Sequence, residues 1–124
     1  MASKYVDIST IKYFMNNVQE LDKILTSKRF EDYNIESVDM FIDSVKQFAD
    51  RELFPYFKEM DENPAHYKDG SINVHQQVER MMKDGGAMGL IAAPFDYDDG
   101  GLQLPLLVHT CLLYTSPSPR DWMV

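Results

Sequence analysis

A single amphipathic stripe between residues 35 and 60 limits most strongly what this chain can fold into. Apolar side chains recur there at the spacing of one face of an α-helix: Val38, Phe41, Ile42, Val45, Phe48, Ala49, Leu53, Tyr56, Phe57 and Met60. Pro55 lies inside the stripe and has no backbone N–H, so a kink or break is expected near residues 52–54. Because the stripe stays in phase on both sides of the proline, we expect one kinked helix over residues 35–60.

Weaker helical patterns precede this stripe. Residues 8–25 carry two short apolar groups at helical spacing, and either Asp7 or Ser9 can cap the first of them. Residues 26–34 are mostly polar and predict a connection. After the stripe, residues 61–71 contain Asn-Pro and Asp-Gly pairs and predict a loop.

The second half of the chain predicts two further helices. One is expected to be capped by the pair Asn73 and Gln76 and closed by Gly85-Gly86, and a turn-rich segment follows at residues 94–101. Pro105 can open the other helix within residues 102–113. The predicted fold class is all-α, with orthogonal or up-down helices and an irregular C-terminal tail. Five side chains are expected to be buried and two exposed: Phe41, Val45, Phe48, Phe57 and Met81, against Asp98 and Asp99.

Composition excludes several function classes. Twelve Lys and Arg against twenty Asp and Glu give a net charge of −8, which opposes binding to a phosphate backbone, so no nucleic-acid partner is expected. No apolar run is long enough for a membrane span, and the N-terminus has no apolar signal core, so a cytoplasmic location is expected. The single cysteine, Cys111, cannot form an internal disulfide.

The sequence contains no complete catalytic or metal-binding pattern. Asp96, Asp98 and Gly101 lack the remaining ligands of a calcium loop, and Gly85, Gly86 and Gly89 follow a helix where a dinucleotide fingerprint follows a strand. Three histidines have no partner at zinc-ligand spacing: His66, His75 and His109. His109 and Cys111 are two residues apart and would face different ways on a helix. No catalytic residue, cofactor-binding residue or metal site is therefore predicted from residue chemistry, which indicates only an acidic, mostly helical domain.

The order of the motifs resembles the N-terminal helical domain of the acyl-CoA dehydrogenases. The resemblance covers about residues 4–110 and consists of an ordered set: Phe48-Ala49-Asp50-Arg51-Glu52-Leu53-Phe54-Pro55, Asp61-Glu62, Gly86-Ala87-Met88-Gly89-Leu90-Ile91-Ala92-Ala93-Pro94, Tyr97, Gly100-Gly101 and Leu102. Asp98-Asp99 and Gln103 depart from the family pattern, as tolerable variations in a loop. The implied organisation is short helices and a connection over residues 1–34 and the family-like helical region over residues 35–111.

The C-terminal residues depart from the family altogether. Beyond about Cys111 the family continues its helix and then enters a β domain and a helical bundle. Here the sequence reads Leu112-Leu113-Tyr114-Thr115-Ser116-Pro117-Ser118-Pro119-Arg120-Asp121, which looks like translated sequencing-adapter DNA. We therefore expect a truncated fragment in which residues 112–124 form a non-native, irregular tail.

The resemblance implies a flavin-dependent oxidoreductase that dehydrogenates acyl-CoA thioesters. In the family, a glutamate base removes the α-proton while a β-hydride passes to FAD, and that glutamate and most flavin contacts belong to later domains. No catalytic or FAD-binding residue is carried over, so the fragment itself is expected to be structural and inactive. Only a loop is implied to lie beside the substrate: Pro94, Tyr97, Gly100, Gly101 and Leu102.

The implied partners belong to the complete enzyme. They are the remaining domains of the same chain, the acyl-CoA substrate, an electron-transfer flavoprotein and further copies in a homo-oligomer. The alternative interpretation is a self-contained acidic helical protein-interaction module, because the apolar pattern is sufficient for a core and no catalytic group is visible.

Overall fold

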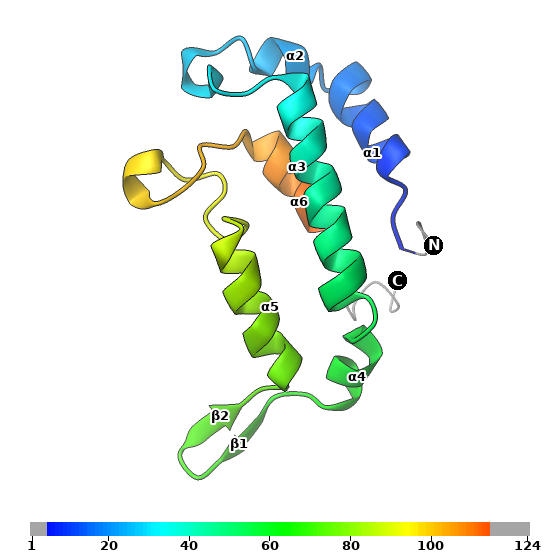
Figure 1. Ribbon diagram of the computed structural model, residues 1–124, viewed down its shortest axis with the longest axis vertical. Coiled ribbons are helices and arrows are strands. Elements are labelled where there is room, and N and C mark those ends of the chain that lie inside the picture. Colours follow the sequence, from blue (N-terminus) through cyan, green and yellow to red (C-terminus); the bar gives the residue numbers. More distant parts are fainter. Residues whose placement is uncertain (1–4, 115–124) are drawn as a thin grey trace.

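The computed structural model describes residues 5–114 and is mostly helical, as the sequence predicts (Figure 1). Residues 115–124 of the expected tail lie outside this range. The elements, in chain order, are α1 (Ile8–Tyr13), the π-helical turn η1 (Phe14–Val18), α2 (Leu21–Ile24), the 3₁₀ turn η2 (Lys28–Phe30), α3 (Ile35–Phe48), the π-helical turn η3 (Ala49–Leu53), α4 (Phe57–Glu62), β1 (His66–Lys68), β2 (Ser71–Asn73), α5 (Gln76–Ala87), the 3₁₀ turn η4 (Tyr97–Asp99) and α6 (Leu106–Tyr114).

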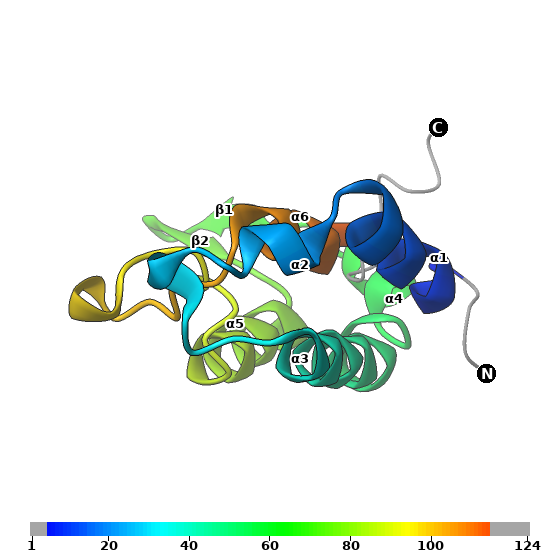
Figure 2. The same ribbon diagram turned by 90° about the horizontal axis from the view of Figure 1, so that it is seen from above.

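The helices form two layers. Figure 2 shows α3 and α5 side by side in one layer, with α1, α2 and α6 in the other. The core lies between the layers and draws residues from both: Met15, Leu21, Val38, Ile42, Val45, Ala93, Leu104, Val108 and Leu112. Within residues 5–114 no helix is both long enough and apolar enough to cross a bilayer.

Helix α3 is well defined at its start. The Ser37 N–H donates to Asn34 Oδ1 at 2.8 Å, and the Asn34 N–H donates to Ser37 Oγ at 2.9 Å, so a reciprocal capping box satisfies two free N–H groups. Val45 and Phe48 are buried as predicted, and Asp98 and Asp99 are exposed as predicted. Three expected core residues are only half-buried: Phe41, which packs at the edge of the core, Phe57 and Met81.

The helix breaks at residues 54–56, next to the region that the sequence predicts, but it does not continue as one kinked helix. The Phe54 N–H donates to the carbonyl of Ala49 at 2.8 Å, a bond five residues long that widens the helix into η3. Pro55 offers no N–H to Arg51, so residues 54–56 turn and α4 starts afresh at Phe57. The extra residue of the π-helical turn shifts the apolar stripe, and none of α4 is buried.

The N-terminal segment is tied to this break. The Tyr5 hydroxyl donates to Asp50 Oδ1 at 2.6 Å, and Lys46 Nζ donates to the same oxygen at 2.5 Å. The Tyr5 ring stacks on Phe54 with centroids 5.0 Å apart, and Lys46 Nζ lies 4.6 Å from the Tyr5 ring centroid. Burial and the Asp50 carboxylate raise the pKa of Tyr5, so its hydroxyl stays a donor.

A short β-hairpin occupies part of the segment predicted as a loop, in a chain whose mostly helical content is compatible with the expected all-α fold class. Strands β1 and β2 are antiparallel, with Tyr67 opposite Ile72. Asp69 and Gly70 both have positive φ, 53° and 83°, as a two-residue hairpin turn of type I′ requires. All six strand residues are exposed, and each strand is three residues long, which is too short for alternation to mark it in the sequence.

Both ends of α5 differ from the prediction. His75 caps its start, because His75 Nδ1 accepts from the Gln77 N–H at 3.0 Å, whereas Asn73 belongs to β2. The helix continues through Gly85-Gly86 to Ala87, and Gly89, whose φ is 81°, follows its C-cap Met88. The Leu90 N–H bonds to the Gly85 carbonyl and the Gly89 N–H to the Gly86 carbonyl, both at 3.0 Å, which is a Schellman motif.

Helix α6 follows Pro105, as the sequence predicts, and extends into the segment expected to be an irregular tail. It begins one residue after Pro105 and runs to Tyr114, so residues 112–114 are helical and not irregular. Leu112 is buried in the core.

A buried carboxylate joins the end of α3 to α5. Glu52 in η3 is 6% exposed, and its oxygens accept from Arg51 Nε at 2.9 Å and Gln77 Nε2 at 3.2 Å. Gln77 Nε2 also donates to the Glu52 backbone carbonyl at 2.8 Å, and Arg80 Nε lies 3.4 Å from Glu52 Oε2. The hydrogen bond from Arg51, opposed by desolvation and supported by Gln77 and the charge of Arg80, lowers the pKa of Glu52.

The packing of α3 can be tested with two substitutions on its opposite faces. Ile42→Ala removes a side chain that is 0% exposed and should lower the free energy of unfolding by about 2–5 kcal/mol. Met40→Ala, at a position that is 70% exposed, should change it by less than about 0.5 kcal/mol. Urea unfolding followed by circular dichroism measures both, and similar losses for the two variants would contradict this orientation of α3.

The Glu52 network predicts a particular pH dependence. The pKa of Glu52 is lower in the folded chain than its ordinary value of 4.5, so its stabilisation is complete above that pH and is lost as pH falls through the folded value. Between about pH 5 and pH 3 the free energy of unfolding should therefore fall less steeply in Glu52→Gln than in the wild type. Glu79→Gln, at an exposed position on α5, is the matched control and should keep the wild-type slope. An unchanged slope in Glu52→Gln would be evidence against the network.

Candidate functional site

The segment between α5 and α6 forms a self-bonded loop. Its two ends meet at Ala93, whose carbonyl accepts from Leu102 N–H at 3.3 Å and Leu104 N–H at 2.9 Å. Further along, the Gln103 N–H donates to the Phe95 carbonyl at 2.8 Å and the Gly101 N–H to the Asp96 carbonyl at 2.9 Å. Ala93 and Leu104 belong to the core, so the loop is anchored at its base.

Glycines allow the close approaches within this loop. A Cβ placed on Gly101 would lie 2.1 Å from the Phe95 carbonyl oxygen, so no other residue fits without moving the backbone. Gly89 has φ of 81°, and a Cβ there would lie 2.8 Å from Leu102 Cδ1. Gly100 also has positive φ, 83°, but open space around it. The glycine pattern of the sequence therefore serves the shape of the loop.

The five residues expected to lie near a substrate are together on this loop and differ in exposure. Gly101 is buried, Pro94 and Leu102 are half-buried, and Tyr97 and Gly100 are exposed. The structure therefore brings together the expected residues on one segment of the chain: Pro94, Tyr97, Gly100, Gly101 and Leu102.

The residues that hold the loop in place come from the connection before α3, which sequence reasoning missed. The Tyr97 hydroxyl donates to Asp32 Oδ2 at 3.0 Å, and the Arg29 guanidinium pairs with the Asp96 carboxylate. The Tyr33 hydroxyl donates to the Leu102 carbonyl, and Gln103 Nε2 donates to the Arg29 carbonyl at 3.2 Å. These partners are 65–74 residues apart in the chain, so no local sequence pattern indicates these contacts.

The chemistry of the loop is that of a hydrogen-bonding surface. Desolvation and the hydrogen bond to Asp32 raise the pKa of Tyr97 to about 12, so its hydroxyl is a donor at neutral pH and not a base. Cys111, on α6, is half-buried, and burial raises the pKa of its thiol, which lowers its reactivity. Among residues 5–114, no three His, Cys, Asp or Glu side chains form a group that could hold a metal ion.

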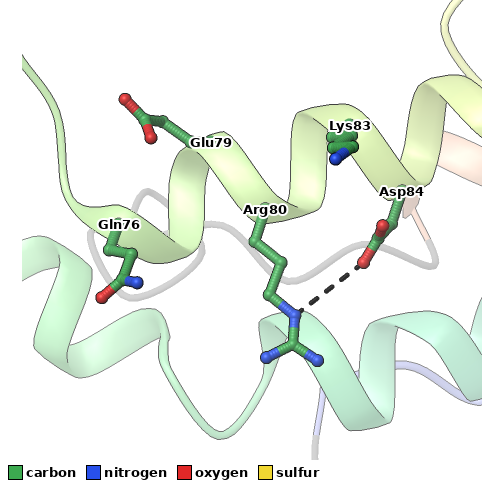
Figure 3. A pocket seen from close by; sticks show the side chains of 5 residues that line it. All are labelled: Gln76, Glu79, Arg80, Lys83 and Asp84. Atoms are coloured by element: carbon green, nitrogen blue, oxygen red, sulfur yellow. Dashed lines mark ion pairs between the residues drawn. The ribbon is translucent and has the colours of Figure 1, made fainter.

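Two surface depressions lie elsewhere. Figure 3 shows the first, an open hollow along α5 lined by Gln76, Glu79, Arg80, Lys83 and Asp84, where Arg80 turns toward Asp84 with Nε and Oδ2 3.9 Å apart. The second is at the base of the hairpin and is lined by Glu62, Asn63, Pro64, His66, Val74 and His75. In it, His75 Nε2 lies 3.1 Å from Glu59 Oε1. Neither is an enclosed apolar cavity, so neither fits a flavin ring.

Comparisons with protein-family models, curated proteins and solved structures found no match for this chain. The loop of residues 93–104 is therefore a candidate site on its geometry alone. It is a rigid, externally tied loop whose exposed side chains include two aromatic rings, Phe95 and Tyr97.

The shape of the loop can be tested at two adjacent glycines. Gly101→Ala forces a Cβ against a backbone carbonyl and should lower the free energy of unfolding by about 3 kcal/mol. Gly100→Ala meets no atom within 4 Å and should cost about 1 kcal/mol, from its positive φ alone. Chemical denaturation of both variants measures the difference, and a larger loss at Gly100 would contradict the described loop.

Proposed function

We propose that this chain is the N-terminal helical domain of a flavin-dependent acyl-CoA dehydrogenase, with a structural role and no activity of its own. The observation that carries the proposal is the ordered motif set from Phe48 to Leu102. Several of its residues have defined structural roles: Pro55 ends the long helical run, Gly89 closes α5 and Gly101 permits the loop.

The surface of α6 supports a place within a larger protein. This helix is apolar on all sides, a composition typical of helices buried all round. Leu106 and Leu113 lie two turns apart on one face and are 69% and 63% exposed. In the proposal, the later domains of the complete enzyme cover this face, and the sequence from about residue 112 onward replaces the native continuation.

The chemistry of the complete enzyme would come from parts outside this chain. FAD would accept the hydride, and a glutamate of a later domain would take the α-proton. The loop of residues 94–102 would contribute a wall near the substrate, through Pro94, Tyr97, Gly100, Gly101 and Leu102. An electron-transfer flavoprotein and further copies of the enzyme are the proposed partners.

A second candidate is a self-contained acidic helical module that binds another protein. One observation favours it: Tyr67 and Ile72 face each other across the hairpin and are 75% and 73% exposed. Two-stranded hairpins are marginally stable alone, so a partner that covers these side chains would stabilise the hairpin.

The two candidates differ in what the uninterrupted gene encodes. Reading the genomic DNA past the codon of Thr110 should reveal a frame that encodes a β domain and a second helical domain. The full-length protein, purified, should carry stoichiometric flavin whose visible absorbance bleaches when an acyl-CoA is added without oxygen.

The chain of residues 1–124 is the matched control and should be colourless. A genomic frame that ends near residue 124, or a full-length protein without flavin, would refute the enzyme proposal. Capture of a defined protein partner that is lost in Tyr67→Ser with Ile72→Ser would then favour the interaction module.

A further inference from the structure

We propose that the connection at residues 28–33 is a clamp that fixes the position of the loop at residues 94–103. The sequence predicts this connection only as a link between helices, and the proposed enzyme function assigns it no role. The proposal concerns the conformation of the loop and holds whether or not the chain belongs to an acyl-CoA dehydrogenase.

The connection and the loop are each held by hydrogen bonds within their own backbone. In the connection, the Phe30 N–H donates to the Ser27 carbonyl and the Tyr33 N–H to the Phe30 carbonyl, both at 2.9 Å. Its end is continuous with the capping box of α3, and the Tyr33 ring packs against the core. The loop has its own backbone bonds and its anchors at Ala93 and Leu104.

Several side chains join the connection to the loop. Figures 1 and 2 both place the light-blue turn that contains η2 and the yellow loop that contains η4 on the same side of the molecule. Four links cross between them: Arg29 with Asp96, Tyr97 with Asp32, Tyr33 with the Leu102 carbonyl, and Gln103 with the Arg29 carbonyl. The links reach both the tip of the loop and the segment at residues 102–103 that returns to the core.

The links differ in how far their side chains are exposed to solvent. The Arg29 and Asp96 side chains are 45% and 52% exposed, so water and salt weaken that ion pair. Tyr33 is half-buried, and its hydroxyl satisfies a carbonyl at the point where the loop returns to the core. The Tyr33 hydroxyl is therefore the main link, and the ion pair is the secondary one.

The consequence concerns the exposed rings of the loop. Phe95 and Tyr97 are 60% and 45% exposed, and they lie next to or within the clamped residues. The clamp therefore sets where these two side chains are presented on the surface, and Arg29, Asp32 and Tyr33 are positioning residues for any molecule that the loop contacts.

Amide hydrogen exchange on Tyr33→Phe tests the clamp. This variant keeps the ring in the core and removes only the hydroxyl. The amides of Gly101, Gln103 and Leu104 should exchange about five- to tenfold faster than in the wild type, the effect of losing one hydrogen bond. The amides of α3 should change little. Tyr13→Phe, at a tyrosine that is 57% exposed on α1, is the matched control and should leave the loop unchanged.

Two results would overturn the proposal. One is unchanged exchange of the loop amides in Tyr33→Phe. The other is an equal increase in α3 and the loop, which would mean that the hydroxyl stabilises the whole fold. Should Tyr33→Phe not fold, Tyr97→Phe removes the link to Asp32 from an exposed position, and faster exchange of Gly101 confined to the loop is again expected. Unchanged exchange in that variant would contradict the clamp.

Discussion

Burial of the apolar face of α3 is the interaction on which the rest of the structure depends. Val38, Ile42 and Val45 are 0–1% exposed, and burial of each such side chain contributes about 1.5–3 kcal/mol. Helices α1 and α2 contain six and four residues, far too few to persist alone in water. They persist because Met15 of η1, which continues α1, and Leu21 of α2 pack on the core that α3 completes with α6. The two layers therefore stabilise each other.

The end of α3 determines how α5 joins this core. Pro55 ends the regular helix, and the π-helical turn before it carries Glu52 to a position facing α5. A buried carboxylate is costly unless it is satisfied, and Arg51, Gln77 and Arg80 satisfy this one. Gly85 faces the ring of Phe48, which allows close contact between the two helices. Pro55 and Glu52 thus connect the interruption at the end of α3 to the packing of α5.

Local patterns predict the elements that depend on local interactions. The stripe of α3, the interruption at Pro55 and the Asp7 cap of α1 are all visible in the sequence, because each depends on residues within about one or two turns. The hairpin and the His75 cap were missed, since exposed three-residue strands carry no periodic signal and histidine is not among the preferred caps. In the candidate site, the glycines mark the turn-rich segment at residues 94–101 in the sequence, whereas the roles of Arg29, Asp32 and Tyr33 depend on contacts about 70 residues away.

The packing of the two layers can be measured most directly by methyl nuclear Overhauser effects on the protein with labelled Ile, Leu, Val and Met side chains. The account predicts cross-peaks that join Val38, Ile42 and Val45 of α3 to methyl groups of Met15, Leu21, Val108 and Leu112 in the opposite layer. Cross-peaks confined to single helices would contradict it. So would cross-peaks that join α3 only to the exposed methyl groups of Ile72, in the hairpin.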